Sequence, residues 1–406
     1  MQQQKNVYWI VIIAALGYFV DIYDLILYNV IKEDSLASIG ITGEAFKACE
    51  HVLFNWQMFG MMLGGLLWGI MGDKKGRISV LFGSILLYSL ANIANGFVQS
   101  MNQYIICRFI AGIGLAGELG AGITLVSETM HKDKRGIGTM IIVSFGALGA
   151  VAASLVGKST NWQNAYFIGG GLGIALLAMR AGALESGMYK SLSKNMSRNR
   201  GNFFFIFKNK QRTISYLKTI LIGVPIWFII GVLINLSADF VHLEGAANKE
   251  LVGQAVMFAY IGLSAGDLVS GVLSQWFRSR KKVIYIYLIA SVIIILFYLF
   301  EPTTSFNEFR LKCFLLGAGT GYWALFVQVA SESFGTNIRS TVTNTVPNFV
   351  RGLVVPITLS FKWLKGFFES PQQAALVVGG ICLLISFISI SLMKETFSED
   401  LDYIEE

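Results

Sequence analysis

The feature that most constrains this chain is a series of apolar runs, each about 20 residues long, separated by short polar segments. A helix of that length crosses the roughly 30 Å hydrocarbon core of a bilayer. Apolar and polar residues do not alternate within the runs, so the pattern favours helices over the strands of a membrane barrel. Because backbone N–H and C=O groups in lipid need partners inside the protein, the pattern predicts a helix bundle.

Twelve runs are predicted, which gives an all-α membrane protein with 12 transmembrane helices. Hydrophobic residues make up 54% of the 406 residues and charged residues 14%, and a soluble domain could not bury that much apolar surface. The predicted spans lie near 7–31, 51–71, 78–97, 102–128, 137–156, 164–184, 217–241, 252–275, 282–299, 309–334, 341–364 and 372–394. The first run is too long for a signal peptide and is expected to stay in the mature protein.

Basic residues predict the orientation of the chain. They cluster in short loops after the second, fourth and eighth runs: Lys74, Lys75, Arg77; Lys132, Lys134, Arg135; Arg278, Arg280, Lys281, Lys282. By the positive-inside rule these loops and both termini face the cytoplasm, which places the protein in the cytoplasmic (inner) membrane. The net charge of +7 is explained by these loops, so we expect no nucleic-acid partner. Scattered cysteines and only three histidines predict no metal or cofactor.

The second half of the chain repeats the first. Glu128 and Arg135 recur as Glu332 and Arg339 with the same internal spacing, and Gly69 recurs as a glycine at the end of the eighth run. Similar offsets at separate places indicate duplication of a six-helix unit in parallel orientation. The predicted division is a six-helix bundle over 1–184, a polar cytoplasmic linker over 185–216, and a second six-helix bundle with a short cytoplasmic tail over 217–406.

The loop between the second and third runs reads Gly69-Ile-Met-Gly-Asp73-Lys-Lys-Gly76-Arg77. Its glycines allow a tight turn and close helix ends, and Asp73 and Arg77 can form charge-assisted bonds with neighbouring helix ends. The stretch resembles the loop signature of the major facilitator superfamily, Gly-x-x-x-Asp-Arg/Lys-x-Gly-Arg. With the repeated Glu…Arg pairs and the six-plus-six layout, this resemblance covers essentially the whole chain.

The resemblance implies two six-helix bundles related by pseudo-twofold symmetry, which transport by alternating access. It also implies an electrostatic latch on the cytoplasmic side that forms when the transporter opens outward. The predicted latch residues are Gly69, Asp73, Gly76, Arg77, Glu128, Arg135, Glu332 and Arg339. The second copy departs from the pattern, because Gln275 and Ser279 stand at the positions of Asp73 and Arg77. A symmetric second latch is therefore not expected, although Arg278 and Arg280 can pair with Glu332.

The first and fourth runs indicate a branch of the superfamily. The fourth run carries Arg108, a ladder of small residues and Glu118, and the first carries Asp21 and Asp24. Close helix packing explains the small residues but not the charges. The arrangement is similar to the metabolite:proton and aromatic acid:proton symporter branches, with sugar-porter features as well. The prolines within predicted spans, Pro225, Pro347 and Pro356, are either ordinary kinks or parts of flexing gates.

The charges within the runs predict a coupling site. Buried ions must pair, face water or bind a proton. Asp21 and Asp24 lie three residues apart on one helical face, where two carboxylates raise each other's proton affinity. The proton-coupling candidates are Asp21, Asp24 and Glu118. The alternative is that one aspartate simply neutralises Arg108.

Arginines within the runs predict the substrate class. The guanidinium of Arg351 offers a fork for a carboxylate or phosphate, unless it pairs structurally with Asp267 or Glu332. Neutral side chains in the same runs can add hydrogen bonds, although aromatic ones are more often packing residues. The substrate-binding candidates are Arg108, Arg351, Tyr322, Trp323, Gln328, Asn235, Asn55 and Gln57.

These features predict a monomeric secondary transporter that imports a small organic anion or zwitterion together with protons. Its only other partner is expected to be the lipid bilayer. Two alternatives stay open: a facilitator or exporter of a neutral sugar, metabolite or siderophore, and a non-transporting membrane sensor on the same scaffold. An enzyme is not expected, because the sequence contains no nucleophile–base pair and no phosphate loop.

Overall fold

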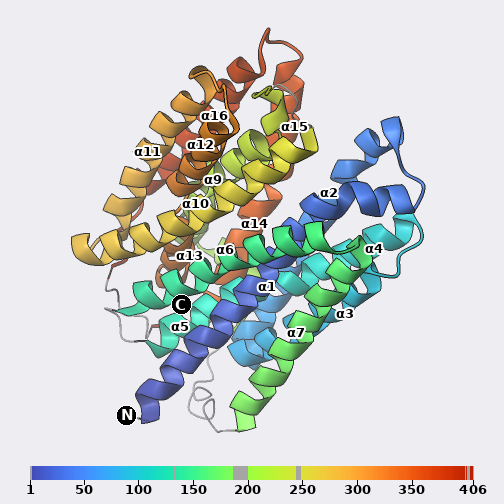
Figure 1. Ribbon diagram of the computed structural model, residues 1–406. Coiled ribbons are helices and arrows are strands. Elements are labelled where there is room, and N and C mark those ends of the chain that lie inside the picture. The colour runs from blue at the N-terminus through green and yellow to red at the C-terminus, as the bar shows by residue number, and fades with distance from the viewer. Residues whose placement is uncertain are drawn as a thin grey trace.

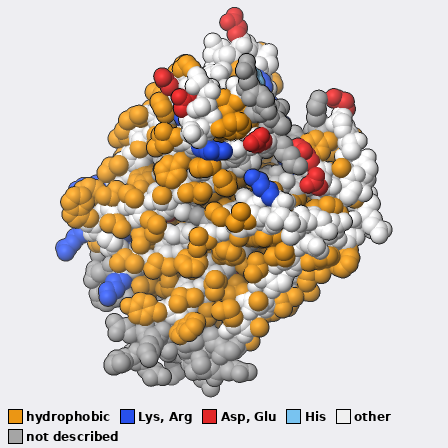
Figure 2. Space-filling view, in the orientation of Figure 1, with side chains coloured by type: hydrophobic (Ala, Val, Ile, Leu, Met, Phe, Trp, Pro, Cys, Tyr) orange, Lys and Arg blue, Asp and Glu red, His pale blue; other side chains and the backbone are white. Residues whose placement is uncertain are grey.

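The computed structural model describes residues 2–130, 134–185, 200–243, 248–397, 399 and 403–405, and their regular structure is helical throughout. Within this part of the chain, nine helical spans are long and apolar enough to cross a membrane. Figure 2 shows apolar side chains spread over most of one face. Large apolar side chains such as Leu155, Ile293 and Leu384 are exposed, which suits contact with lipid rather than water. The predicted all-α membrane fold is confirmed.

Seven helices form the N-terminal bundle (Figure 1): α1 Gln2–Ser38, α2 Gly43–Lys75, α3 Arg77–Asn95, α4 Met101–Leu115, α5 Glu118–Thr129, α6 Arg135–Ser159 and α7 Trp162–Glu185. The predicted fourth run appears as two helices, α4 and α5. The interruption includes Gly117, where an added Cβ would lie 2.7 Å from the Cβ of Ser84 in α3. The absence of a side chain therefore lets α3 pack closely against the break.

The C-terminal bundle is more interrupted than the N-terminal one. It consists of α8 Lys210–Ile222, α9 Val224–Phe228, the π-helical turn η3 Ile229–Ile234, the short turn η4 Ser237–Asp239, α10 Asn248–Phe277, α11 Arg280–Phe300, α12 Phe306–Gly319, α13 Trp323–Glu332, α14 Arg339–Gly352, α15 Val354–Lys365 and α16 Pro371–Ser391. Pro225 occupies the first turn of α9, and Pro356 follows the break between α14 and α15. Proline cannot donate to the carbonyl four residues earlier, which weakens the helix before it. Pro347, by contrast, lies inside α14 without a break.

The linker is only partly described. Residues 186–199 lie outside the described residues. A short helical turn, η2 Phe203–Lys208, precedes α8, which begins at Lys210, within the predicted linker. The side chain of Asn209 accepts hydrogen bonds from the backbone N–H groups of Gln211 and Arg212 and so caps this helix start. The proposed domain boundaries stay predictions.

The two ends of the molecule, here called the latch end and the far end, differ in the segments that they carry. The latch end carries the turn between α2 and α3, the segment between α13 and α14, and both chain termini. The far end carries the turns between α3 and α4 and between α15 and α16, and lies toward the upper right of Figure 1. The bundles meet where α2 packs along α14 and α6 packs along α10.

Candidate functional site

The first cluster of buried charge lies inside the N-terminal bundle. Asp24 in α1 pairs with Arg108 in α4, with 3.1 Å between Oδ2 and Nη1. Gln57 in α2 donates from Nε2 to Asp24 Oδ2 at 2.8 Å and accepts from Arg108 through Oε1. The rings of Tyr28 and Tyr166 lie 5.1 and 5.9 Å from the guanidinium carbon. Arg108 therefore has a counter-ion, an amide and two aromatic faces in a site with no exposure to solvent.

The second cluster joins the two bundles. Asp21, one turn before Asp24 on α1, pairs with Arg351 in α14, with 3.2 Å between Oδ2 and Nη2. Arg351 also donates from Nη1 to Asn348 Oδ1 at 3.3 Å, and its guanidinium lies 5.6 Å from the ring of Trp323. Among the described residues, Asp21 Oδ1 and Arg351 Nε have no hydrogen-bond partner. This pair is fully buried, crosses the bundle junction and keeps bonding capacity for a further group.

Glu118 belongs to a third cluster that lies apart from these two arginines. It pairs with Arg180 in α7, with 2.6 Å between Oε2 and Nη2, and accepts from Ser84 Oγ at 2.6 Å. Arg180 also donates to the carbonyl of Leu81. The sequence analysis did not single out Arg180, although an arginine inside an apolar run is itself a signal of a buried partner.

Asp267 in α10 binds the backbone at the start of another helix of the C-terminal bundle, α13. Its Oδ1 accepts from the backbone N–H of Ala324 at 2.9 Å, at the start of α13, where the tenth predicted run is broken. A carboxylate at a helix start satisfies N–H groups that have no partner within the helix. Arg351 therefore pairs with Asp21 rather than with Asp267 or Glu332, the two alternatives left open from sequence.

Two of the predicted substrate residues bond elsewhere. Tyr322 donates from its hydroxyl to the carbonyl of Ile222 at 3.0 Å and so ties α8 to the break before α13. Gln328 donates to Glu332 Oε1 at 2.7 Å, one turn further along α13 toward the latch end. Neither side chain is brought to the two buried aspartate–arginine pairs, whereas Trp323 is.

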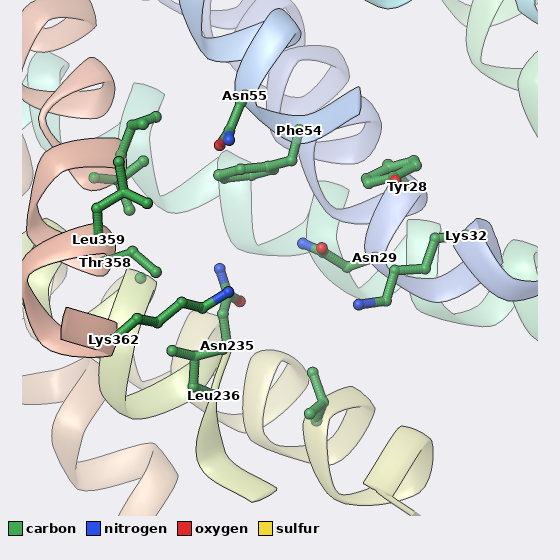
Figure 3. A pocket seen from close by; sticks show the side chains of 14 residues that line it. Tyr28, Asn29, Lys32, Phe54, Asn55, Asn235, Leu236, Thr358, Leu359 and Lys362 are labelled. Carbon is green, nitrogen blue, oxygen red and sulfur yellow. The ribbon is translucent and has the colours of Figure 1, made fainter. Parts of the chain in front are cut away.

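A pocket between the bundles lies toward the far end (Figure 3) and encloses about 690 Å³ of space, part of it open to solvent. The predicted residues Asn55 and Asn235 line it, together with Tyr28. Since the Tyr28 ring also faces Arg108, the pocket wall adjoins the first charge cluster. Lys32 and Lys362 line the pocket too, and the sequence analysis missed them. Both lysines lie near those ends of the predicted runs that face away from the cytoplasm. The positive-inside rule does not favour basic residues there, and this unusual position could have identified them.

At the latch end, Asp73 binds the start of α14. Its Oδ1 accepts from the backbone N–H of Ser340 at 3.0 Å, and its Oδ2 accepts from that of Thr341 at 2.8 Å. These N–H groups lie in the first turn of the helix, where a negative charge is favourable. Gly69 lies one turn earlier, and a Cβ there would be 2.8 Å from the Cα of Thr341. The turn needs Gly76 as well, because its φ is 95°.

Glu128 takes an arginine from each bundle. Arg77 pairs with it at 2.7 Å between Nη2 and Oε1, and Arg339 of the C-terminal bundle at 3.2 Å between Nη1 and the same oxygen. Arg77 also donates to the carbonyl of Thr336 across the junction at 3.2 Å. Arg135, a predicted latch residue, donates to the carbonyl of Met130 and to that of Glu399 in the C-terminal tail.

In the second copy of the motif, the ion pair of Glu332 lies within the C-terminal bundle, whereas Arg339 pairs with Glu128 across the junction. Glu332 pairs with Arg280 within the C-terminal bundle, at 3.2 Å between Oε1 and Nη2, and accepts from Thr396 Oγ1 at 2.9 Å. The predicted pairing of Arg280 with Glu332 is confirmed.

The sequence analysis also missed the C-terminal tail, which fastens to the latch end. Glu405 pairs with Arg212 at 3.1 Å, and the carbonyl of Tyr403 accepts from the backbone N–H of Thr336 at 2.9 Å. Glu395 accepts from Ser279 Oγ and from the backbone N–H of Arg280. Burial alone would raise the pKa of Glu395, but these hydrogen bonds hold it below its ordinary value.

Comparisons with known proteins agree on one family. The family model described as Major Facilitator Superfamily matches residues 11–357. The chain is 26% identical to the putative niacin/nicotinamide transporter NiaP of Bacillus subtilis (strain 168), over 84% of each chain. It is 25% identical to the probable 4-methylmuconolactone transporter of Cupriavidus pinatubonensis, over 97% of this chain and 91% of that one.

A solved structure has the same fold. The proton:xylose symporter XylE bound to 6-bromo-6-deoxy-D-glucose matches with a TM-score of 0.76 and 16% identity, over 98% of each chain. The two helix bundles agree with this match. The chain therefore belongs to the major facilitator superfamily and is a membrane transporter of small organic metabolites rather than an enzyme.

Proposed function

We propose that the protein is a proton-coupled symporter that imports a small organic anion by alternating access. The observation that carries this proposal is the Asp21–Arg351 pair, which is buried and links the two bundles. An ion pair inside a bundle can be purely structural. One that spans the moving junction must break or change partners when the bundles rearrange.

The pair supplies a reason for coupling. While Asp21 is ionised, its charge satisfies Arg351, and an anionic substrate would have to compete with it. Protonation of Asp21 removes that charge and leaves the guanidinium to bind the substrate carboxylate, since a buried arginine without a counter-ion is costly. Proton and anion then favour the same state of the protein, which is the condition for symport.

The other charge clusters have supporting roles. Asp24 neutralises Arg108 within one bundle, so this pair can persist while the bundles move, and it provides a second candidate proton site near the pocket. Glu118 is held by Arg180 and Ser84, which makes it the weakest of the three predicted proton carriers. Asn55 and Asn235 lie in the pocket wall as neutral hydrogen-bonding groups for the substrate.

The substrate class follows from the arginines and is supported by two relatives. The first is named for niacin, a small aromatic carboxylate, and for nicotinamide, its neutral amide, and 4-methylmuconolactone, for which the second is named, carries a carboxylate. A guanidinium fork matches the two oxygens of such a group. A compact monocarboxylate of this size is therefore the proposed substrate.

We propose that the protein lies in the cytoplasmic (inner) membrane, with the latch end and both termini on the cytoplasmic side. The basic loops at this end support that orientation through the positive-inside rule. With the latch closed and the pocket toward the far end, the structure corresponds in this proposal to an outward-facing state.

The test is uptake by the purified protein in proteoliposomes. A thermal-shift screen of small carboxylates and their neutral amides first selects the anion that stabilises the protein most. We expect an inward proton gradient to drive accumulation of that anion, and Arg351→Gln to lower uptake about tenfold or more. Asp239→Asn is the control, because Asp239 is part of an exposed pair with Lys365. Uptake that ignores the gradient, or that survives Arg351→Gln, would contradict the proposal.

A further inference from the structure

Asp267 is a buried carboxyl group without a counter-ion among the described residues. It has no exposure to solvent, and its Oδ2 has no hydrogen-bond partner in this part of the chain, while Oδ1 accepts from the backbone N–H of Ala324. The other buried acidic side chains of the described residues each lie within 3.5 Å of an arginine nitrogen: Asp21, Asp24, Asp73, Glu118 and Glu332. Asp267 therefore needs another way to be neutralised.

The helices around Asp267 bring hydrogen-bonding groups but no positive side chain. The phenols of Tyr18 in α1 and Tyr287 in α11 lie within electrostatic range of it. Among the described residues, no titratable side chain of α6, α12, α13, η3 or η4, the other elements packed on α10, interacts with it. The N–H groups at the start of α13 offset only part of a full negative charge. A buried carboxyl group in these surroundings is expected to hold a proton.

The place of Asp267 connects such a proton to the buried arginine. Asp267 holds the start of α13, and the ring of Trp323, the first residue of that helix, lies 5.6 Å from the guanidinium of Arg351. An added Cβ on Gly321 would be 2.3 Å from the Cα of Gly266, so the break before α13 lies directly on the backbone of α10. An ionised carboxylate binds the N–H groups of a helix start more strongly than a protonated one does. Gain or loss of the proton therefore changes how firmly Trp323 is held at Arg351.

We propose that Asp267 is a second proton site, in the C-terminal bundle, so that two protons enter with each anion, one on Asp21 and one on Asp267. This inference rests on the proposed function and deepens it, because it adds the stoichiometry. A proton from the outer solution binds Oδ2 as an O–H group and leaves the same oxygen on the cytoplasmic side, and no other bond changes. Two protons and one monovalent anion carry one net positive charge inward. Transport is therefore driven by the membrane potential as well as by the pH gradient.

The test applies a pH gradient and a membrane potential separately to proteoliposomes. A potassium gradient with valinomycin sets an inside-negative potential at equal pH, and the labelled probe is the anion selected by the thermal-shift screen, with nicotinate and benzoate among the compounds screened. The wild type is expected to respond to either force. For one net charge, about 100 mV raises the accumulation ratio up to about 50-fold.

Asp267→Asn removes the second proton and little else. Asparagine has the shape of the protonated acid and keeps an oxygen that can accept from the N–H of Ala324. The variant is expected to move one proton with one anion, so that the pH gradient still drives uptake and the potential no longer does. Asp239→Asn is the matched control, because Asp239 lies in an exposed pair with Lys365, and it is expected to keep both responses.

Infrared spectra supply a readout that needs no transport. The C=O stretch of a protonated carboxyl group differs from the bands of an ionised carboxylate. The full chain in lipid at neutral pH is expected to show a protonated carboxyl band that Asp267→Asn lacks and Asp239→Asn keeps. A purely structural helix cap would leave this band and the response to the potential unchanged in Asp267→Asn.

The outcomes separate this inference from the proposed function. An Asp267→Asn variant that still responds to the potential, or that keeps the protonated carboxyl band, would overturn the second proton site. Wild-type uptake that follows the pH gradient but ignores the potential would also overturn it and would leave the proposed symport standing. If neither force drives uptake by the wild type, the proposed symport itself fails.

Discussion

Glu118 and Arg180 form a buried ion pair in which each charge is compensated only by the other. Both side chains are about 1% exposed, and their charges are 2.6 Å apart. Such a pair offsets its own desolvation only while both partners are present. Ser84 and the carbonyl of Leu81 satisfy further bonding positions within the N-terminal bundle, and among the described residues only Nε of Arg180 is left without a hydrogen-bond partner in this cluster.

Arg180→Gln is therefore expected to lower stability by about 3–5 kcal/mol, because it leaves Glu118 buried without a counter-ion. The measurement is the midpoint of thermal unfolding in detergent. Removing both charges, as in Glu118→Gln with Arg180→Met, is expected to cost less than Arg180→Gln alone. If the single and double variants lose equal stability, the electrostatic explanation is wrong and the loss comes from packing.

At the residue scale, the sequence was a better guide to which charges are buried than to which residues they pair with. Asp21, Asp24, Arg108 and Arg351 were identified because ions in apolar runs need compensation. Their pairing depends on which helices adjoin, and that is a tertiary property that one sequence does not carry. For the same reason Tyr322 and Gln328 were assigned to a substrate site, whereas their bonds lie within the C-terminal bundle.

Among the elements, the approach of α2 to α14 sets the state of the latch end. Gly69 lies against Thr341, and an added Cβ there would be 2.8 Å from the Cα and 3.1 Å from the carbonyl oxygen. These are backbone atoms, so the contact cannot be relieved by a side-chain rotation. Asp73 reaches the N–H groups of α14 only because the two helices come this close.

Gly69→Ala is expected to disfavour the closed latch by about 1–3 kcal/mol, the usual cost of inserting a methyl group into a packed contact. Spin labels or cysteine accessibility at the latch end measure the shift toward the open form. Gly171→Ala is the matched control, since an added Cβ at Gly171 in α7 would meet no atom within 4 Å. Equal behaviour of the two variants would show that the α2–α14 contact does not limit opening.

Hydropathy predicted the order and approximate place of the helices, but not their interruptions. The predicted fourth, seventh, tenth and eleventh spans are each broken in the structure. Pro225, Pro347 and Pro356 were predicted as kinks or flexing gates. Pro225 and Pro356 lie at two of these breaks, whereas Pro347 lies inside α14. At the break before α13, Asp267 binds the backbone of Ala324 from another helix. The tail contacts were not predictable either, because the polar residues after α16 gain partners only through the fold.

For the whole molecule, ion pairs between the bundles close one end, whereas a pocket separates the bundles at the other. The latch end is closed by Glu128, which binds arginines from both bundles, while the far end holds a pocket with lysines on both sides. The Asp21–Arg351 pair lies between these ends and is the buried link that a proton can switch in our proposal. Internal duplication in the sequence predicted the two bundles, and the loop motif predicted residues of the latch but not whether the latch is closed.

The most direct test of the central claim is a comparison of net accumulation with exchange in Asp21→Asn proteoliposomes. Asparagine mimics the protonated carboxyl group, so Arg351 stays available to the anion, but the empty carrier lacks the charge that would neutralise Arg351 on its return. We predict that the variant still exchanges labelled for unlabelled anion across the membrane and no longer accumulates it in response to a proton gradient. Full gradient-driven accumulation by Asp21→Asn would contradict the account.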